Sequence, residues 1–193
     1  MNTKMNAAQE VHTAFGTVKD MLRDRQVPVG DKLDAVGYAE IKTLVATKPV
    51  FVVDAPDTVR IIFHLGNKYK SADVKKLLEE PFPLYILVTR DKLSSVNAKQ
   101  MTSETKVVDV FDLGELFFNV SRHALVPRHE PVRRLEDIQA VLDRYRLKNK
   151  HQLPHILRSD PQARYLGLRP GQLVKITRAS PGAGEYVLYR CCV

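Results

Sequence analysis

Prolines and glycines mark the ends of predicted elements in the last third of this 193-residue chain, and they constrain its fold more than any other feature. Asp160-Pro161 has the pattern of a helix N-cap followed by proline at the first helical position. Gly167 stands where a short helix would end in a left-handed residue. Pro170 and Gly171 occupy the central positions of a type II turn. The sequence therefore predicts a short helix that is followed at once by a tight turn.

Periodic patterns on either side of these residues predict a small α+β module. Residues 134–145 have apolar side chains at helical spacing. The side chains that this spacing turns inward are Leu135, Ile138, Val141, Leu142 and Tyr145. Residues 153–157 are expected to be extended, because the residue before Pro154 avoids the helical conformation. Residues 173–177 and 186–190 flank a loop rich in glycine and are predicted to pair as a terminal hairpin.

The first 125 residues have the pattern of an α/β domain. A helix is predicted from Ala7, and one apolar stripe defines its buried side: Val11, Phe15, Val18 and Leu22. A weaker helical pattern over residues 33–44 crosses Gly37. Further along, predicted strands cover residues 50–53, 59–63, 84–89 and 107–111, and predicted helices cover residues 71–80 and 91–99. Strands that alternate with helices favour a mixed sheet with helices packed on its faces.

Composition limits the class of protein further. The chain is 44% apolar and 27% charged, which is typical of a globular fold. Its longest apolar runs, such as residues 84–88, are far shorter than the roughly 20 residues that span a bilayer. The only cysteines, Cys191 and Cys192, are adjacent, so no disulfide framework is available. We therefore expect a soluble protein of a reducing intracellular compartment.

The net charge of +8 is concentrated at the C-terminal end. Residues 1–127 contain 17 Lys/Arg and 16 Asp/Glu, whereas residues 128–193 contain 13 Lys/Arg and only 6 Asp/Glu. A basic surface of this kind meets either nucleic-acid phosphates or acidic protein partners. Both alternatives stay open from the charge alone.

Three segments resemble the fifth subunit of multisubunit DNA-directed RNA polymerases. Residues 14–25, Ala-Phe-Gly-Thr-Val-Lys-Asp-Met-Leu-Arg-Asp-Arg, resemble the opening helix of the eukaryotic subunit. Leu-Val-Pro-Arg-His at residues 125–129 resembles the motif that joins its two domains. Most of residues 144–193 resemble its C-terminal assembly domain, which in archaea forms a separate polymerase subunit by itself.

The chain departs from the family between residues 30 and 60, where it is shorter. This departure leaves the origin open. The chain is either the main nuclear subunit of a cell or a diverged copy, for example one encoded by a large DNA virus. The first origin implies the nucleus and the second implies the host cytoplasm or the virion. Which polymerase is involved also stays open.

The resemblance implies a non-catalytic structural subunit with a jaw domain at residues 1–125 and an assembly domain at residues 126–193. The jaw domain would have a fold similar to restriction endonucleases without their active site, and it would lie in the lower jaw near downstream DNA. The assembly domain would dock on the largest polymerase subunit and neighbour a small shared subunit. The alternative is a free-standing basic nucleic-acid-binding regulator of transcription.

Specific residues follow from this expectation. Long cations and tyrosines that the fold itself does not need are predicted to lie in the subunit interface, because arginine binds carboxylates and carbonyls with fixed geometry. The predicted interface residues are His129, Arg144, Tyr145, Arg146, Arg158, Arg164, Tyr165, Tyr189 and Arg190. Arg90 and Lys92 lie in the segment that corresponds to the DNA-proximal loop of the family. They would contribute weak, sequence-independent phosphate contacts.

Catalytic and metal sites are not predicted. His151 and His155 are four residues apart, but Pro154 between them argues against the helix that would align their rings, and no Cys-x-x-Cys is present. A nuclease site needs an acidic residue followed by a Glu-x-Lys pair on the next strand. Here the Glu-Ile-Lys triplet at residues 40–42 precedes Asp57 and lies in a predicted helix. The sequence therefore predicts no cofactor and no metal ion.

Overall fold

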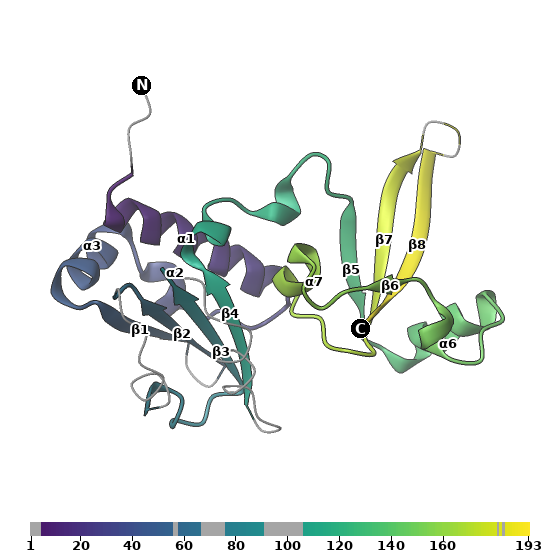
Figure 1. The fold of residues 1–193 in the computed structure, drawn as a ribbon, viewed down its shortest axis with the longest axis horizontal. Coiled ribbons are helices and arrows are strands. Elements are labelled where there is room, and N and C mark those ends of the chain that lie inside the picture. The colour runs from purple at the N-terminus through teal and green to yellow at the C-terminus, as the bar shows by residue number, and fades with distance from the viewer. Residues whose placement is uncertain (1–4, 56–57, 67–75, 91–105, 181, 183) are drawn as a thin grey trace. The chain divides into compact units, whose positions relative to one another are not determined.

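The computed structural model describes residues 5–55, 58–66, 76–90, 106–180, 182 and 184–193 (Figure 1). The chain forms two compact units, residues 1–118 and 119–193. The sequence predicts a division between residues 125 and 126 instead. Side-chain hydrogen bonds explain why the structure divides the chain after residue 118. Asn119 Nδ2 donates to Tyr165 Oη at 2.9 Å, and Gln162 Nε2 donates to Ser121 Oγ at 3.0 Å. These bonds join residues 119–121 to the C-terminal unit.

The N-terminal unit is built on a four-stranded mixed sheet in the order β1-β2-β3-β4. Its described elements are α1 (Ala7–Asp24), α2 (Asp31–Ala35), α3 (Tyr38–Thr47), β1 (Val50–Ala55), β2 (Val59–His64), β3 (Leu84–Thr89), β4 (Val107–Asp112) and the 3-10 turn η1 (Leu113–Leu116). Strand β1 is antiparallel to β2, whereas β2, β3 and β4 are parallel to one another. The four predicted strands and the mixed sheet are confirmed.

Helix α1 begins at a capping box and buries the predicted stripe. Asn6 Oδ1 accepts a hydrogen bond from Gln9 N at 2.8 Å, and the Gln9 side chain accepts one from Asn6 N at 2.9 Å. The apolar stripe from Val11 to Leu22 is buried. Phe15 packs against Phe63 of β2, which places α1 on one face of the sheet.

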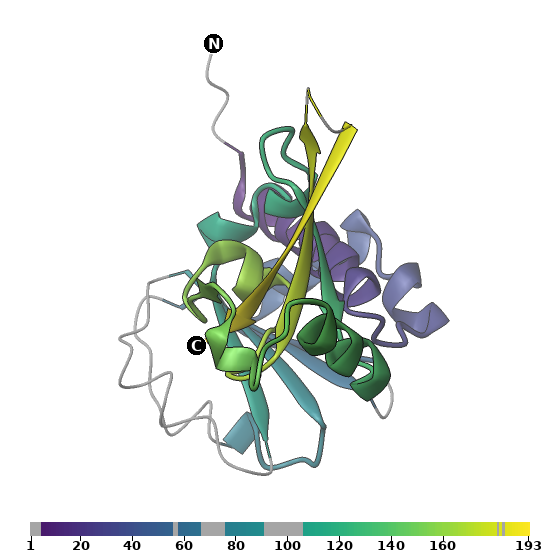
Figure 2. The same ribbon diagram turned by 90° about the vertical axis from the view of Figure 1, so that its right-hand side faces the viewer.

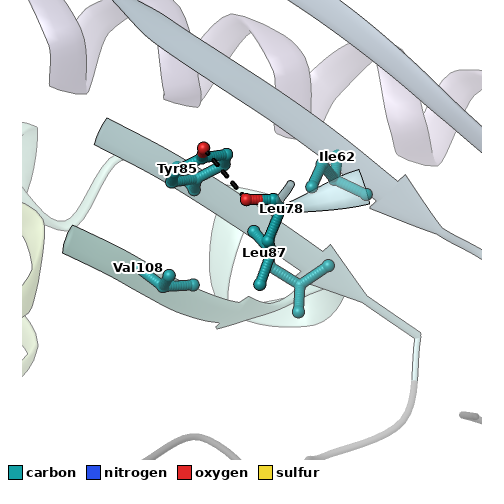
Figure 3. Close-up of a cluster of buried hydrophobic side chains, with 5 residues drawn as sticks. All are labelled: Ile62, Leu78, Tyr85, Leu87 and Val108. Carbon is teal, nitrogen blue, oxygen red and sulfur yellow. Dashed lines mark hydrogen bonds between the residues drawn. The ribbon is translucent and has the colours of Figure 1, made fainter. Parts of the chain in front are cut away.

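The other face of the sheet carries a second apolar cluster. Figure 3 shows its buried members, which are Ile62, Leu78, Tyr85, Leu87 and Val108. The hydroxyl of Tyr85 donates to the Leu78 carbonyl at 3.3 Å, so its polar end is satisfied inside the cluster. Strand β2 is buried along its whole length, because apolar side chains cover both of its faces.

Two helical predictions in this unit need comment. The pattern over residues 33–44 forms two helices, α2 and α3, because Gly37 takes an extended conformation and becomes the N-cap of α3. A single helix across Gly37 is therefore wrong. The predicted helix over residues 71–80 lies mostly outside the described residues, and the one over residues 91–99 lies entirely outside them.

The C-terminal unit is a second four-stranded sheet with short helices beside it. Its elements are η2 (Val120–Arg122), β5 (Arg128–Val132), α6 (Leu135–Arg144), η3 (Lys150–Gln152), β6 (His155–Ile156), α7 (Pro161–Tyr165), β7 (Leu173–Ser180) and β8 (Gly184–Cys192). The strand order is β5-β7-β8-β6. Strands β7 and β8 form the predicted terminal hairpin, drawn in yellow in Figures 1 and 2. The hairpin continues past β6 (Figure 1). The predicted α+β module is confirmed.

The predicted positions of proline and glycine at the ends of helices and in the turn are also confirmed. Asp160 accepts hydrogen bonds from the backbone of the first turn of α7, Pro161 opens that helix, and Gly167 follows it with φ 66°. Gly171 has φ 81°, and Gln172 N donates to Arg169 O at 3.0 Å to close the turn.

Helix α6 buries less of its apolar side than its spacing predicts. Val141 is buried, whereas the side chain of Leu135 is 83% exposed and that of Tyr145 is 43% exposed. Val141 packs with Leu153, Leu173 and Cys191 in the core of this unit. The prediction that Leu135 and Tyr145 face the core is wrong, because both side chains, one at each end of α6, are exposed.

Candidate protein interface

Arg146 lies just after α6 and has a left-handed backbone conformation that L-residues avoid. Its φ is 54°, and it follows the helix where glycine is usual. Leu147 N donates to Leu142 O at 2.9 Å and Arg146 N donates to Asp143 O at 3.1 Å, which completes a Schellman motif. A left-handed arginine costs roughly 1–2 kcal/mol relative to the usual backbone. Arg146 therefore carries an exposed side chain at a backbone position that the Schellman motif fixes.

Aromatic and cationic side chains gather beside this cap. Tyr145 contacts Tyr189 of β8 edge to face, with 6.0 Å between the ring centroids. The guanidinium carbon of Arg144 lies 5.9 Å from the centroid of the Tyr145 ring. Three predicted interface residues are thus adjacent to one another and to the Arg146 cap. Exposed arginine and tyrosine of this kind are enriched at protein interfaces.

The other predicted cations have different surroundings. Arg190 donates through Nη1 to the His155 carbonyl at 3.0 Å, so it also joins β8 to β6. Arg158 is exposed and Arg164 is partly buried. His129 is half-buried beside the Pro127 carbonyl, 2.7 Å from its Nδ1, and burial lowers the pKa of its imidazole.

Tyr165 is not a surface residue of the C-terminal unit. Its side chain is only 4% exposed, and its hydroxyl accepts the hydrogen bond from Asn119. The ring of Tyr165 therefore packs within its own unit, and its contact with a partner stays a prediction. Several exposed apolar side chains were missed, since hydrophobic periodicity assigns such residues to a core. Those of the C-terminal unit include Leu125, Leu135, Leu157 and Tyr186.

The two histidines considered for a metal site lie in different elements, and Nε2 of His155 is 3.1 Å from the backbone carbonyl of His151. His151 lies in η3 and His155 in β6, so they do not share a helical face. The triplet at residues 40–42 lies in α3, and Asp57 is outside the described residues. Within the described ranges, no three His, Cys, Asp or Glu side chains gather as metal ligands would. In the same ranges no helix is long and apolar enough to cross a bilayer.

The two cysteines are free thiols in the core of the C-terminal unit. Burial raises the pKa of both, so each favours the protonated form. In the N-terminal unit, Arg90 follows β3 and lies 3.6 Å from Glu10 of α1. Lys92 lies outside the described residues.

The C-terminal α+β unit is basic and exposes arginine and tyrosine side chains, which are enriched at protein interfaces. Residues 118–192 match the family described as RNA polymerase Rpb5, C-terminal domain. Subunit rpabc1 of DNA-directed RNA polymerases I, II and III from Dictyostelium discoideum is 42% identical over 149 residues, which cover 72% of this chain and 74% of that protein. Subunit RPABC1 from Caenorhabditis briggsae is 38% identical over 194 residues, covering 97% of this chain and 86% of that protein. The chain belongs to the Rpb5 family of RNA polymerase subunits, as the resemblance in the sequence predicts.

Replacing Arg146 by glycine should show how much the left-handed backbone at this position lowers the stability of the C-terminal unit. We expect Arg146→Gly to stabilise the C-terminal unit by about 0.5–1 kcal/mol, because glycine adopts the left-handed cap without strain. Gln26, which ends α1 with φ 60°, offers a matched position in the other unit. Thermal unfolding of both glycine variants measures the effect. An Arg146→Gly variant that unfolds more easily than Arg146→Ala would contradict the assigned strain.

Proposed function

We propose that this chain is a structural subunit of a nuclear DNA-directed RNA polymerase and has no catalytic site of its own. The observation that carries the proposal is the extent of the similarity. It runs over 97% of this chain against a relative named as a subunit of polymerases I, II and III, and so includes both units. The chain would contribute to assembly, and RNA synthesis would be catalysed by other subunits. This role places the protein in the nucleus.

The C-terminal unit is proposed to dock on the largest polymerase subunit beside a small shared subunit. Its support is the cluster of Arg144, Tyr145, Arg146 and Tyr189, which presents two exposed guanidinium groups next to an aromatic pair. Carboxylates and carbonyls of a partner would bind such groups with fixed geometry. His129, Arg158, Arg164 and Arg190 remain proposed interface residues.

Docking through this cluster can be tested with paired variants. Arg144→Ala with Arg146→Ala should lower the fraction of the chain that co-purifies with polymerase about tenfold, because hydrogen bonds to charged groups are lost. The matched control is Lys42→Ala with Lys48→Ala, which removes two exposed cations from the N-terminal unit. Equal recovery of both double variants at full stoichiometry would exclude the cluster from the interface.

The N-terminal unit is proposed to form part of the lower jaw, with a fold similar to restriction endonucleases and no nuclease site. The mixed sheet with α1 on one face supports a fold of this kind. The only acidic–lysine triplet considered for a nuclease lies in helix α3 and is on no strand. A shared fold would carry no activity by itself.

Contact between the jaw and downstream DNA is proposed at Arg90 and Lys92. Arg90 is exposed where β3 ends, which supports a phosphate contact, although it also lies near Glu10. Arg90→Ala with Lys92→Ala should reduce the salt dependence of DNA binding by assembled polymerase by roughly one to two units of the logarithmic slope. The affinity measured from low to moderate salt gives that slope. An unchanged slope would remove both residues from the DNA contact.

A free-standing transcription regulator remains the second candidate, favoured by the 13 Lys/Arg against 6 Asp/Glu in residues 128–193. Such a protein would bind nucleic acid without polymerase. The purified chain alone would then shift DNA at physiological salt, whereas a docking subunit would need the polymerase to do so.

A further inference from the structure

One edge of the C-terminal sheet is left open along β8. Strand β7 pairs with β8 along the whole hairpin, from Gly184 to Cys191. On its other side, β8 pairs with β6 only at Cys191 and Cys192. Residues 184–190 therefore form a strand edge with no neighbour among the described residues. Figure 1 shows the same arrangement, with the hairpin continuing past β6.

The register fixes which backbone groups point to this open edge. Cys192 N donates to Gln172 O at 2.8 Å on the β7 side, and Cys191 N donates to Pro154 O at 2.9 Å on the β6 side. Alternate residues of a strand direct their amide and carbonyl groups to the same side. The N–H and C=O groups of Glu185, Val187 and Tyr189 therefore point away from β7. The strand register gives them no partner within the described part of the chain.

The opposite edge of the same sheet is protected. Strand β5 pairs with β7 at Arg128 and Glu130, so its outward groups belong to His129 and Pro131. Pro131 has no N–H, and the side chains of Arg128 and Glu130 form an ion pair at 2.7 Å along this strand. Proline and charged side chains are the usual means by which edge strands avoid pairing.

The middle of the β8 edge, between Glu185 and Arg190, has neither proline nor a charged side chain. Residues 186–189 are Tyr-Val-Leu-Tyr, which combine high β-propensity with no proline and no charge. Val187, Leu188 and Tyr189 are only partly buried, and Tyr186 is 57% exposed. A strand of this composition with free backbone donors is suited to pair with an added strand.

We propose that the β8 edge from Glu185 to Tyr189 binds an extended segment of another polymerase chain as an additional β-strand. This inference rests on the proposed function and adds how the C-terminal unit would dock. Arg178, Leu188 and Arg190 lie on one face of the hairpin, because their positions alternate along the paired strands. The bound segment would set an apolar side chain over Leu188 and acidic side chains beside the two arginines.

Charge favours such a partner over a second copy of this chain. Residues 128–193 contain 13 Lys/Arg against 6 Asp/Glu, so two copies would bring like charges together. An acidic segment would instead be attracted to the same edge. The occupant is therefore assigned as an extended acidic–apolar segment of a different chain.

Proline substitution tests this edge directly. Glu185→Pro with Val187→Pro removes two outward N–H donors and leaves the hydrogen bonds to β7 in place, since neither N–H takes part in that ladder. Glu185→Ala with Val187→Ala removes the same side chains and keeps both donors. We expect the proline pair to lower co-purification with polymerase roughly tenfold and the alanine pair to lower it much less. Circular dichroism of the free full-length variants checks that both fold.

The outcomes distinguish the edge from the proposed function. A wild-type chain that fails to co-purify with polymerase would contradict the proposed function. A wild-type chain that co-purifies, with folded proline and alanine variants recovered equally, would overturn the edge alone. Amide hydrogen exchange of the wild-type chain needs no variant: residues 185, 187 and 189 should become protected in purified polymerase. Fast exchange of these amides in the complex, or their protection in a dimer of the free chain, would also overturn the inference.

Discussion

Replacing Asp109 by alanine is expected to lower the free energy of unfolding of the N-terminal unit by about 3–5 kcal/mol. Asp109 of β4 and Arg25, just after α1, form an ion pair at 2.7 Å, and their side chains are only 11% and 5% exposed. Replacing Asp109 removes a carboxylate that lies 2.7 Å from a buried guanidinium, and breaking a buried ion pair is costly. The pair also joins the end of α1 to the sheet, so its loss should loosen that helix.

An exposed pair provides the matched control for this prediction. Arg23 and Asp34 lie 2.6 Å apart, but about half of each side chain is exposed. Asp34→Ala should cost less than about 1 kcal/mol, because solvent screens the pair. Urea denaturation of the full chain measures both variants. Equal losses for Asp109→Ala and Asp34→Ala would show that burial does not set the energy of the Arg25–Asp109 pair.

Leu173→Ala is the second variant with a large expected effect, a loss of about 2–5 kcal/mol from the C-terminal unit. The Leu173 side chain is fully buried at the centre of the cluster that contains Val141, Leu153 and Cys191. Its removal leaves a cavity between β7, β8 and α6, where the surrounding side chains cannot collapse completely. Thermal unfolding followed by circular dichroism would detect the loss.

Leu135→Ala is the control, because it makes the same chemical change in the same unit. Its side chain is 83% exposed, so we expect a change within about 0.5 kcal/mol. If Leu135 contacts a partner, its variant should instead weaken co-purification with polymerase at unchanged stability. A loss of stability at Leu135 as large as that at Leu173 would contradict the observed packing of α6.

Elements that depend on local backbone sterics could be predicted from the sequence. Asp160, Pro161, Gly167 and Gly171 act within a few residues of themselves, so the short helix and the turn follow from their chemistry alone. The strands β2 and β3 were predicted for a similar reason. Their short runs rich in β-branched and aromatic residues indicate strands without any knowledge of the neighbours.

Features that depend on distant residues could not be predicted in this way. Tyr165 is buried by a unit that includes Asn119, 46 residues earlier in the chain. Leu135 and Tyr145 have helical spacing, but spacing does not say how much of α6 the sheet covers. Arg146 gives no local signal for a left-handed cap, because the hydrogen bonds of the helix end impose that conformation on it.

Affinity purification of the tagged full-length chain under native conditions, with identification of the co-purifying proteins, tests the central claim most directly. We predict that the chain elutes in a complex many times larger than its own 21.9 kDa and that the large catalytic subunits of a DNA-directed RNA polymerase accompany it in equal amounts. A chain that elutes at its own mass, with no polymerase subunit bound, would contradict the claim that it is a structural subunit of that enzyme.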